Sequence, residues 1–325
     1  MSGIEVYDNR YIEKINSLLE KNNDLYLEGY ANFIQNSSLS TVYSYIGYVI
    51  RFLRSRKKEI TNIRLDDYTA YLSTLRKYTS SYQIAVYSAL KIFSSYCVAN
   101  GYTTIDYMER VSRPKYKESK KTKEKRENGY LEKGEISECI NNISTGVGND
   151  LARKKQEKWK NRDMLLLKMF LNTGMRCSAL YKLDIESIEF DKKRLMTVDK
   201  GGAVQEFPLD DNLLKLALEW IEDRKKMLGE RKEAALFISN RLSRMSQDAI
   251  ADVIVKYSST IEDKRITPHK LRATYATQIY EETRDIYLVK ECMAHSNPAV
   301  TSLYVRGQKN ASRQKGASIM AELTT

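Results

Sequence analysis

The chain has 325 residues, 30% of them charged, and a formal net charge of +12 at pH 7. A chain of this length can bury two moderate cores, which indicates about two domains. Such an excess of Lys and Arg is typical of nucleic-acid-binding proteins, with an anionic membrane surface as the competing partner. The sequence has no apolar run of membrane-spanning length and no signal-peptide core. We therefore expect a soluble protein of the cytoplasm, associated with the nucleoid, and no membrane partner.

The cysteines argue against a disulfide framework and against a zinc site. They are scattered and form no Cys-x-x-Cys pair, so buried free thiols are expected. The chain also has no glycine-rich phosphate loop and no His-Glu-x-x-His motif. We expect no metal and no cofactor. Prolines and glycines are few, which favours helices. The cysteines are Cys97, Cys139, Cys177 and Cys292.

The first third of the chain reads as a small all-α domain over residues 1–112. Apolar side chains at helical spacing predict two short helices within residues 9–35 and longer ones that start at Thr41, at Asp66 or Asp67, and at Ser80 or Ser81. Basic side chains between the apolar stripes would grip DNA phosphates, although a solvated surface explains them too. These side chains are Arg51, Arg54, Arg56, Lys57, Lys58, Arg76, Lys77 and Lys91.

Residues 113–129 form the boundary between the two domains. The segment is polar, dense in charge and without an apolar period, which indicates a linker. Its excess of Lys and Arg suits a strap along a DNA backbone. A solvated tether is an equally good interpretation.

The second domain covers residues 130–325 and is predicted to be mainly helical with a small β-hairpin. Residues 144–158 read as a polar loop. Strands are expected at 194–200 and 203–208, joined by a two-residue turn at Gly201-Gly202. Helices are expected through Ile136 to Ile143 and over 161–171, 212–227, 246–257, 270–280 and 286–293, followed by a tail with a short apolar patch at Ile319, Met320 and Leu323.

The residues that carry chemistry are concentrated near the end of the chain. The only two histidines, His269 and His295, lie in one short block with Arg272 and Tyr304. His269 and Arg272 are three residues apart and so share a helical face, behind a helix start at Pro268. A guanidinium, two imidazoles and a phenol could together carry out nucleophilic attack on a phosphodiester without a metal. Each residue taken alone would be read as a packing or capping residue, and their occurrence in one short block favours the chemical role.

Two further cations lie upstream of this block. Arg176 follows the turn Asn172-Thr-Gly174 and is expected at the start of the next helix. Its guanidinium could clamp the same phosphate as Arg272. Lys200 is expected at the tip of the β-hairpin.

These motifs resemble the two signature blocks of the tyrosine recombinases, the phage integrase family. His-x-x-Arg, followed by Ala-His-Ser-Asn ahead of Thr-Ser-Leu-Tyr304, resembles the second block, and Thr-Gly-x-Arg176 resembles the first. The resemblance is strong over residues 130–305 and loose before them. It implies a two-domain architecture, a helical core-binding domain and a mixed, mostly α catalytic domain. One departure is Ala179, which stands where the family commonly has an acidic residue three after the arginine.

The resemblance also implies the chemistry at the phosphate. Tyr304 would attack a DNA phosphodiester and form a 3′-phosphotyrosine, without a metal or a nucleotide. Arg176 and Arg272 would hold the non-bridging oxygens, and His295 would add a donor.

Two residues would move protons in such a reaction. Lys200 would protonate the departing 5′ oxygen, and His269 would assist proton transfer at the tyrosine. The 5′-hydroxyl of a partner strand would then complete integration, excision, inversion or resolution.

The partners implied are double-stranded DNA with specific recombination sites, a homo-tetramer on two such sites, and, as a further factor, an accessory DNA-bending protein. The tail from 317 to 323 would dock on a neighbouring protomer. A type IB topoisomerase-like enzyme and a catalytically idle DNA-binding regulator on the same fold are the alternatives. The tail argues against the first, and the complete set of six residues against the second.

Overall fold

The computed structural model describes residues 3–25, 27–118, 120, 129–198 and 204–293. The backbone divides into two compact units, Met1–Lys120 and Lys121–Thr325, here called the N-terminal and the C-terminal unit. The division falls inside the segment 113–129. Among the described residues, no helix combines the length and the apolar character that crossing a bilayer requires.

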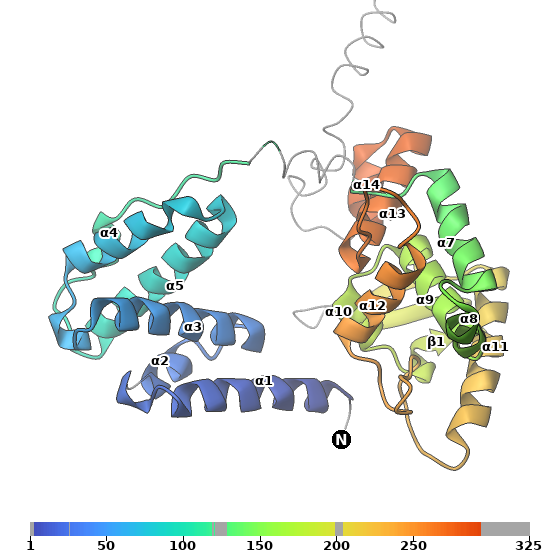
Figure 1. Cartoon of the computed structure of the whole chain (residues 1–325), viewed down its shortest axis with the longest axis horizontal. Coiled ribbons are helices and arrows are strands. Elements are labelled where there is room, and N and C mark those ends of the chain that lie inside the picture. Colours follow the sequence, from blue (N-terminus) through green and yellow to red (C-terminus); the bar gives the residue numbers. More distant parts are fainter. Residues whose placement is uncertain (1–2, 26, 119, 121–128, 199–203, 294–325) are drawn as a thin grey trace, which may run out of the picture. The chain divides into compact units, whose positions relative to one another are not determined.

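Every regular element in the described part of the N-terminal unit is a helix (Figure 1). Its core helices are long because apolar residues recur at helical spacing along each of them. In chain order the elements are α1 (Gly3–Glu20), η1 (Asn23–Leu25), α2 (Glu28–Phe33), α3 (Leu39–Arg56), η2 (Ile60–Asn62), α4 (Leu65–Thr74), η3 (Leu75–Lys77), α5 (Ser80–Ala99) and η4 (Tyr107–Arg110).

Three helix starts in this unit lie a residue or two before the expected ones. Helix α3 begins at Leu39 instead of Thr41, with Ser38 as its cap, and α4 and α5 also begin early. The N–H of Arg64 donates to the carboxylate of Asp67 over 2.9 Å, so Asp67 closes the first turn of α4 instead of opening it. At α5 the hydroxyl of Thr79 accepts from the N–H of Tyr82 over 3.4 Å, so Thr79 is the cap and Ser80 is already helical.

Aromatic rings hold the helices of the N-terminal unit together. Phe52 of α3 stacks on Tyr68 of α4 with ring centroids 4.8 Å apart, and Phe93 of α5 meets Tyr30 of α2 edge-on at 5.4 Å. All four rings are buried. The Tyr30 hydroxyl donates to the carbonyl of Ala89 over 3.1 Å, so its polar end is satisfied inside the core.

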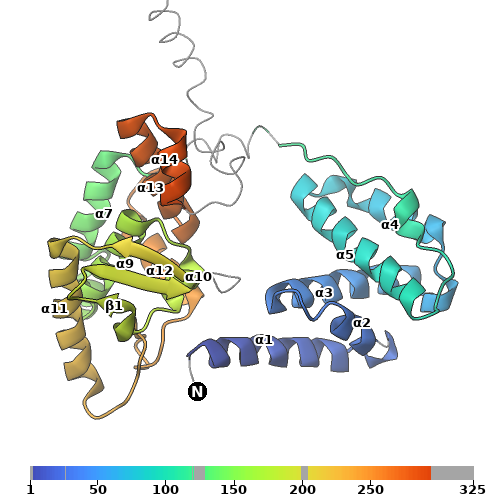
Figure 2. The same cartoon turned by 180° about the vertical axis from the view of Figure 1, so that it is seen from behind.

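The C-terminal unit is mainly helical with a small antiparallel sheet, as predicted. The sheet has three strands in the order β1-β2-β3. Strands β2 and β3 run side by side across one face of this unit (Figure 2). The elements are α7 (Lys133–Thr145), α8 (Asp150–Glu157), α9 (Lys160–Thr173), α10 (Cys177–Tyr181), η5 (Ile185–Ser187), β1 (Ile188–Glu189), β2 (Arg194–Val198), β3 (Val204–Pro208), α11 (Asp211–Leu228), α12 (Gln247–Tyr257), α13 (Pro268–Thr283) and α14 (Ile286–Cys292).

The prediction of a polar loop over residues 144–158 was wrong in part, because helix α8 lies within this range. The side chain of Asn149 caps this helix by accepting from the N–H of Ala152 over 2.9 Å. No residue of α8 is buried, and Leu151 is 72% exposed. The helix therefore lacks the apolar stripe by which sequence reasoning finds helices.

The strand pairing also differs from the expected hairpin. A two-residue turn at Gly201-Gly202 would place Val198 opposite Gln205, but Val198 pairs with Val204. The observed register puts Phe207 opposite the buried Leu195 and Gln205 opposite Thr197. A shift by one residue would bring Glu206 to this buried face, which is why the register is fixed.

Helix α9 is the central element of the C-terminal unit and packs against α7, α11, α12 and α13. Its Asp163 is completely buried and accepts from Arg162 (2.8 Å), from the hydroxyl of Tyr257 (2.9 Å) and from Lys256 (3.3 Å). A buried carboxylate is tolerated only with such partners. Because Lys256 and Tyr257 belong to α12, the network fixes α12 on α9.

The thiols are free, as predicted from their spacing. Cys97 and Cys139 are buried, and Cys177 and Cys292 are half-buried. Burial raises the pKa of Cys177, which directly follows Arg176, to about 12, so this thiol is protonated at neutral pH.

Candidate active site

The end of α9 shapes the turn that precedes Arg176. Gly174 adopts a left-handed conformation, with φ of 59°, and its N–H donates to the carbonyl of Phe170 over 2.9 Å. The hydroxyl of Thr173 accepts from the N–H of Met175 over 3.2 Å. Arg176 is then the N-cap of α10, as expected, and is exposed.

Gly174 has no room for a side chain. A Cβ atom on this residue would lie 2.2 Å from Cδ1 of Tyr275 on α13. The turn and α13 are therefore in direct contact, and both its conformation and its neighbour require glycine here.

Arg272 joins three segments of the C-terminal unit. Its side chain is buried, with Nη1 donating to the carbonyl of Gly174 and Nη2 donating to the carbonyl of Met293 over 2.6 Å. These bonds run from α13 to the turn before Arg176 and to the end of α14. The orientation of the guanidinium is thus fixed by backbone groups.

His269 lies one helical turn before Arg272, in the first turn of α13. The residue is exposed, yet its pKa lies below its ordinary value because the surrounding protein removes part of its solvation and because Arg272 repels a second positive charge. The imidazole is therefore neutral at pH 7 and is able to accept a proton.

The remaining expected site residues are Lys200, His295 and Tyr304, and they lie outside the described residues. So does the tail from 317 to 325. The described strands end at Val198 and resume at Val204, on either side of the segment that contains Lys200. The described chain ends at Met293, two residues before His295.

Ala179 is buried in α10, and its N–H bonds back to the carbonyl of Arg176 over 2.9 Å. It offers Arg176 no carboxylate. A residue of this size fits the buried position, where an acid would require its own partner.

Sequence reasoning missed Tyr275, whose ring covers Gly174. Its pKa is raised to about 12, first by burial and then by Cys292, which lies within hydrogen-bonding reach. Tyr275 therefore keeps its proton at neutral pH, and its role is to hold the turn against α13. The only sequence signal for a role of Tyr275 at the site was its position three residues after Arg272, which places both side chains on one helical face.

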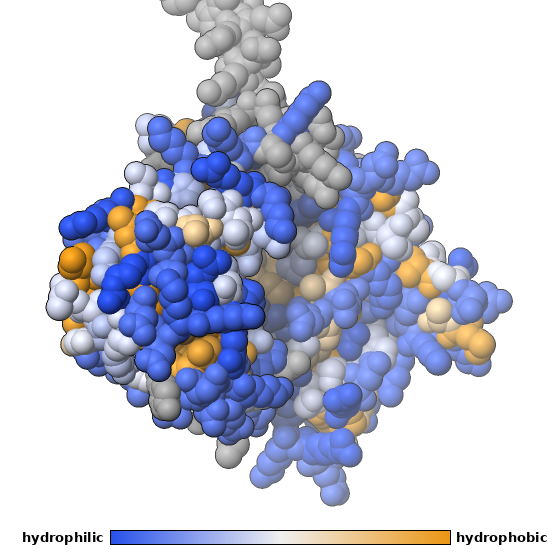
Figure 3. Space-filling model, turned by 60° about the vertical axis from the view of Figure 1, so that its left-hand side comes forward, coloured by the Kyte–Doolittle hydropathy of each residue, from blue (hydrophilic) through white to orange (hydrophobic). Residues whose placement is uncertain are grey.

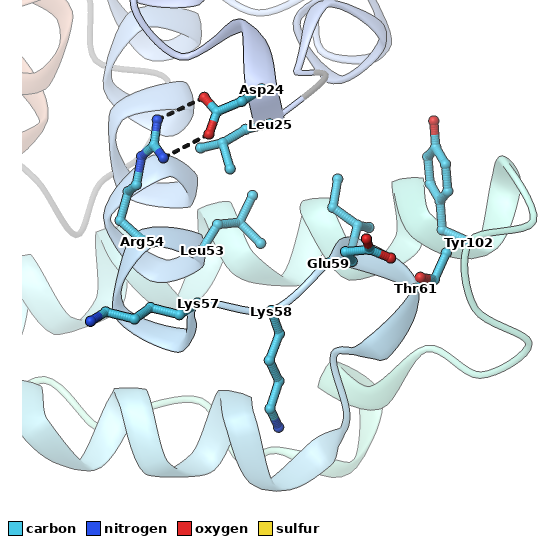
Figure 4. Close-up of a pocket in the computed structure, with 10 residues that line it drawn as sticks. Asp24, Leu25, Leu53, Arg54, Lys57, Lys58, Glu59, Thr61 and Tyr102 are labelled. Atoms are coloured by element: carbon cyan, nitrogen blue, oxygen red, sulfur yellow. Dashed lines mark hydrogen bonds and ion pairs between the residues drawn. The ribbon is translucent and has the colours of Figure 1, made fainter.

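A pocket of about 830 Å³ in the N-terminal unit holds none of the expected site residues. Figure 4 shows Arg54 paired with Asp24 at one wall, and the ammonium groups of Lys57 and Lys58 directed away from each other. Lys58 is paired with Asp67. The cations do not converge, so the pocket is a poor phosphate site. Among the described residues, no group of three His, Cys, Asp or Glu side chains could hold a metal ion.

The sequence profile of the phage integrase family matches residues 131–311, more than half of the chain. The chain therefore belongs to the phage integrase family, the tyrosine recombinases. Tyrosine recombinase XerC of Shewanella sp. (strain ANA-3) is 22% identical over 287 residues, which are 86% of this chain and 89% of that protein. Tyrosine recombinase XerC of Corynebacterium glutamicum is 24% identical over 271 residues, 83% of this chain and 74% of that protein.

Solved structures share the fold. A XerH site-specific recombinase bound to a palindromic difH substrate superposes with a TM-score of 0.69 at 20% identity, covering 95% of this chain and 89% of that chain. A lambda integrase dimer bound to a COC′ core site gives 0.60 at 17% identity, covering 89% and 94%. The two-domain tyrosine recombinase architecture is thereby confirmed. The protein is a site-specific DNA recombinase, and these relatives favour neither a topoisomerase-like enzyme nor an idle regulator.

The contact between Gly174 and Tyr275 predicts the effect of a single methyl group. Gly174→Ala should lower the free energy of unfolding by the cost of the left-handed conformation, roughly 1–2 kcal/mol, and by about 1–3 kcal/mol more from overpacking. Gly101→Ala is the matched control, because Gly101 also has a positive φ but open space around it. Urea unfolding measures both. In a Tyr275→Ala background Gly174→Ala should cost less than in the parent, and equal losses at the two glycines would contradict the contact.

The lowered pKa of His269 predicts a dependence of stability on pH. The unfolded chain binds a proton near pH 6.5, while the folded chain resists it until a lower pH. The stability associated with neutral His269 is therefore complete above pH 6.5 and is lost as the pH falls below it. Unfolding of the parent and of His269→Gln across this range should give curves that diverge only on the acidic side. Parallel curves would show that His269 has an unshifted pKa.

Proposed function

We propose that Arg176, Lys200, His269, Arg272, His295 and Tyr304 form one catalytic set for DNA strand transfer. The observation that carries this proposal is the bond from Arg272 to the carbonyl of Gly174. It joins the helix of His269 and Arg272 to the turn that precedes Arg176. Groups from the two signature blocks, about a hundred residues apart in the chain, thus belong to one rigid assembly.

The phenolic oxygen of Tyr304 forms a bond to the phosphorus, and the bond from phosphorus to the 5′ oxygen breaks. The product is a 3′-phosphotyrosine and a free 5′-hydroxyl. Arg176 and Arg272 stabilise the charge that develops on the non-bridging oxygens, and His295 donates to the same phosphate. Fixed donors are effective here because they need no reorganisation as the charge forms.

Protons pass through two other residues. His269 accepts the proton of Tyr304, for which its neutral state at pH 7 prepares it. Lys200 donates a proton to the departing 5′ oxygen. Attack by the 5′-hydroxyl of a partner strand on the phosphotyrosine then rejoins the DNA, and the chemistry requires no metal or nucleotide.

The substrate we propose is double-stranded DNA with specific recombination sites, bound by a tetramer on two sites. The net charge of +12 supports DNA binding. Support for the assembly comes from a lambda integrase tetramer bound to a Holliday junction, which shares the fold with a TM-score of 0.60 at 15% identity. We further propose that residues 1–112 bind DNA and that residues 113–129 link them to the catalytic domain, residues 130–325. The protein would work in the cytoplasm on the nucleoid. An accessory DNA-bending protein would be an additional partner.

The catalytic assignment predicts that Tyr304→Phe still binds DNA but forms no covalent adduct. Phenylalanine keeps the ring and removes the oxygen that attacks. Incubation with a nicked suicide substrate, followed by a denaturing gel, measures the adduct. Tyr287→Phe is the control, because Tyr287 is 76% exposed on α14 and should react like the parent. A normal adduct yield from Tyr304→Phe would remove Tyr304 from the mechanism.

The proposed assembly predicts a separate role for the tail. Ile319, Met320 and Leu323 lie at helical spacing on a segment too short to be a stable helix alone, so it needs a groove on a protein surface. Deleting residues 317–325 should leave binding to one site nearly intact and weaken cooperative binding to two sites. Gel-shift titration on one-site and two-site DNA compares them. Loss of single-site binding with unchanged cooperativity would place the tail on its own subunit.

A further inference from the structure

A row of tyrosine rings lies across α3 and the start of α5 in the N-terminal unit. Tyr45 and Tyr48 are 6.5 Å apart between ring centroids, Tyr48 and Tyr82 are 5.6 Å apart, and Tyr82 and Tyr78 are 5.1 Å apart. We call these four residues the tyrosine row. Tyr45, Tyr48 and Tyr82 are half-buried, while Tyr78 is 48% exposed. The row therefore leads from the core edge to solvent.

A second exposed ring belongs to the segment that follows η4. Tyr116 is 57% exposed. Its neighbour Lys117 is tied to the start of α5, because the Ser80 hydroxyl donates to the Lys117 carbonyl over 3.0 Å and lies 3.2 Å from the Lys117 N–H. This tie brings the segment of Tyr116 to the same end of α5 as Tyr78.

The backbone of Tyr78 is held on both sides. Its N–H donates to the carbonyl of Leu75 over 2.9 Å, and its carbonyl accepts from the side-chain amide of Gln83 over 2.8 Å. The exposed ring is thus presented from a fixed backbone, which lowers the entropic cost of binding a ligand to it.

Cations accompany the rings. The guanidinium of Arg51 lies 5.0 Å from the ring centroid of Tyr48, and the ammonium of Lys77 lies 5.4 Å from that of Tyr78. Arg76 and Lys115 next to these positions are also exposed. The face of the N-terminal unit seen in Figure 3 is mostly hydrophilic, with hydrophobic side chains scattered over it.

We propose that the exposed rings of Tyr78 and Tyr116 form a stacking surface for unpaired bases of DNA. The other three rings of the tyrosine row pack against the core, and Tyr48 meets Tyr82 edge-on at 88°, so they support Tyr78 from behind and offer no faces of their own. Flat rings stack on the faces of bases of any sequence, and neighbouring cations hold the phosphates between them. Paired bases inside a duplex hide these faces, so the surface discriminates unpaired from paired DNA. The proposal rests on the recombinase function, since strand exchange unpairs bases between the cleaved strands. It adds a second mode of DNA contact to the binding of the duplex.

The test uses the full chain and two oligonucleotide probes that differ only in whether one stretch is paired. A 2-aminopurine base in that stretch reports stacking by loss of fluorescence. The parent should quench the unpaired probe and bind it about tenfold more tightly than the paired one. The variant with Tyr78→Ala and Tyr116→Ala should lose both the quenching and the preference, and the variant with Tyr78→Trp alone should keep them.

Tyr43→Ala is the matched control, because Tyr43 lies on α3, is 38% exposed and contacts Tyr11 instead of the row. It should behave like the parent. Equal affinity of the parent for both probes, or an unchanged preference in the double alanine variant, would overturn the proposal. The measurement needs no cleavage, so a failure of the suicide-substrate experiment and a failure of base stacking are observed separately.

Discussion

The arrangement of the site depends on the side chain of Arg272. A buried guanidinium is costly unless its donors find acceptors, and in this protein two of them meet the carbonyls of Gly174 and Met293. The Gly174 carbonyl lies at the end of α9, and the Met293 carbonyl lies directly after α14. Arg272 of α13 therefore holds the turn before Arg176 and the end of α14 in place. The buried Asp163 network holds α12 against the same central helix. Together they give the exposed site groups a rigid base.

Sequence reasoning succeeded where a local pattern carries the information. Apolar spacing located α9, α11, α12 and α13 to within a few residues, and the glycine before Met175-Arg176 marked a turn that the structure contains. It failed where the determinant is a contact made elsewhere in the chain. The register of β2 and β3 follows from burial of Leu195, α8 has no buried face, and nothing near Tyr275 in sequence indicates that its ring lies on Gly174. Such pairings become visible only when distant segments are folded together.

On the proposals made above, the N-terminal unit would offer DNA two kinds of surface. Its lysines and arginines give a charge that any nucleic acid backbone attracts, whereas its exposed tyrosines offer faces that only an unpaired base can reach. Binding of this kind would change as the DNA passes from paired to unpaired during exchange. The unit would then respond to the progress of the reaction as well as to the presence of a site.

The close approach of residues 174 and 275 also constrains how this sequence can diverge. A side chain at 174 would meet the ring at 275 at 2.2 Å, so position 174 cannot accept a larger residue while the tyrosine is present. Relatives such as the Shewanella XerC share only 22% of their residues with this chain over the aligned region. A lineage that keeps the ring must keep the glycine, and the left-handed backbone at 174 still favours glycine after the ring is reduced. We therefore expect position 174 to change only in relatives that carry a smaller side chain at 275.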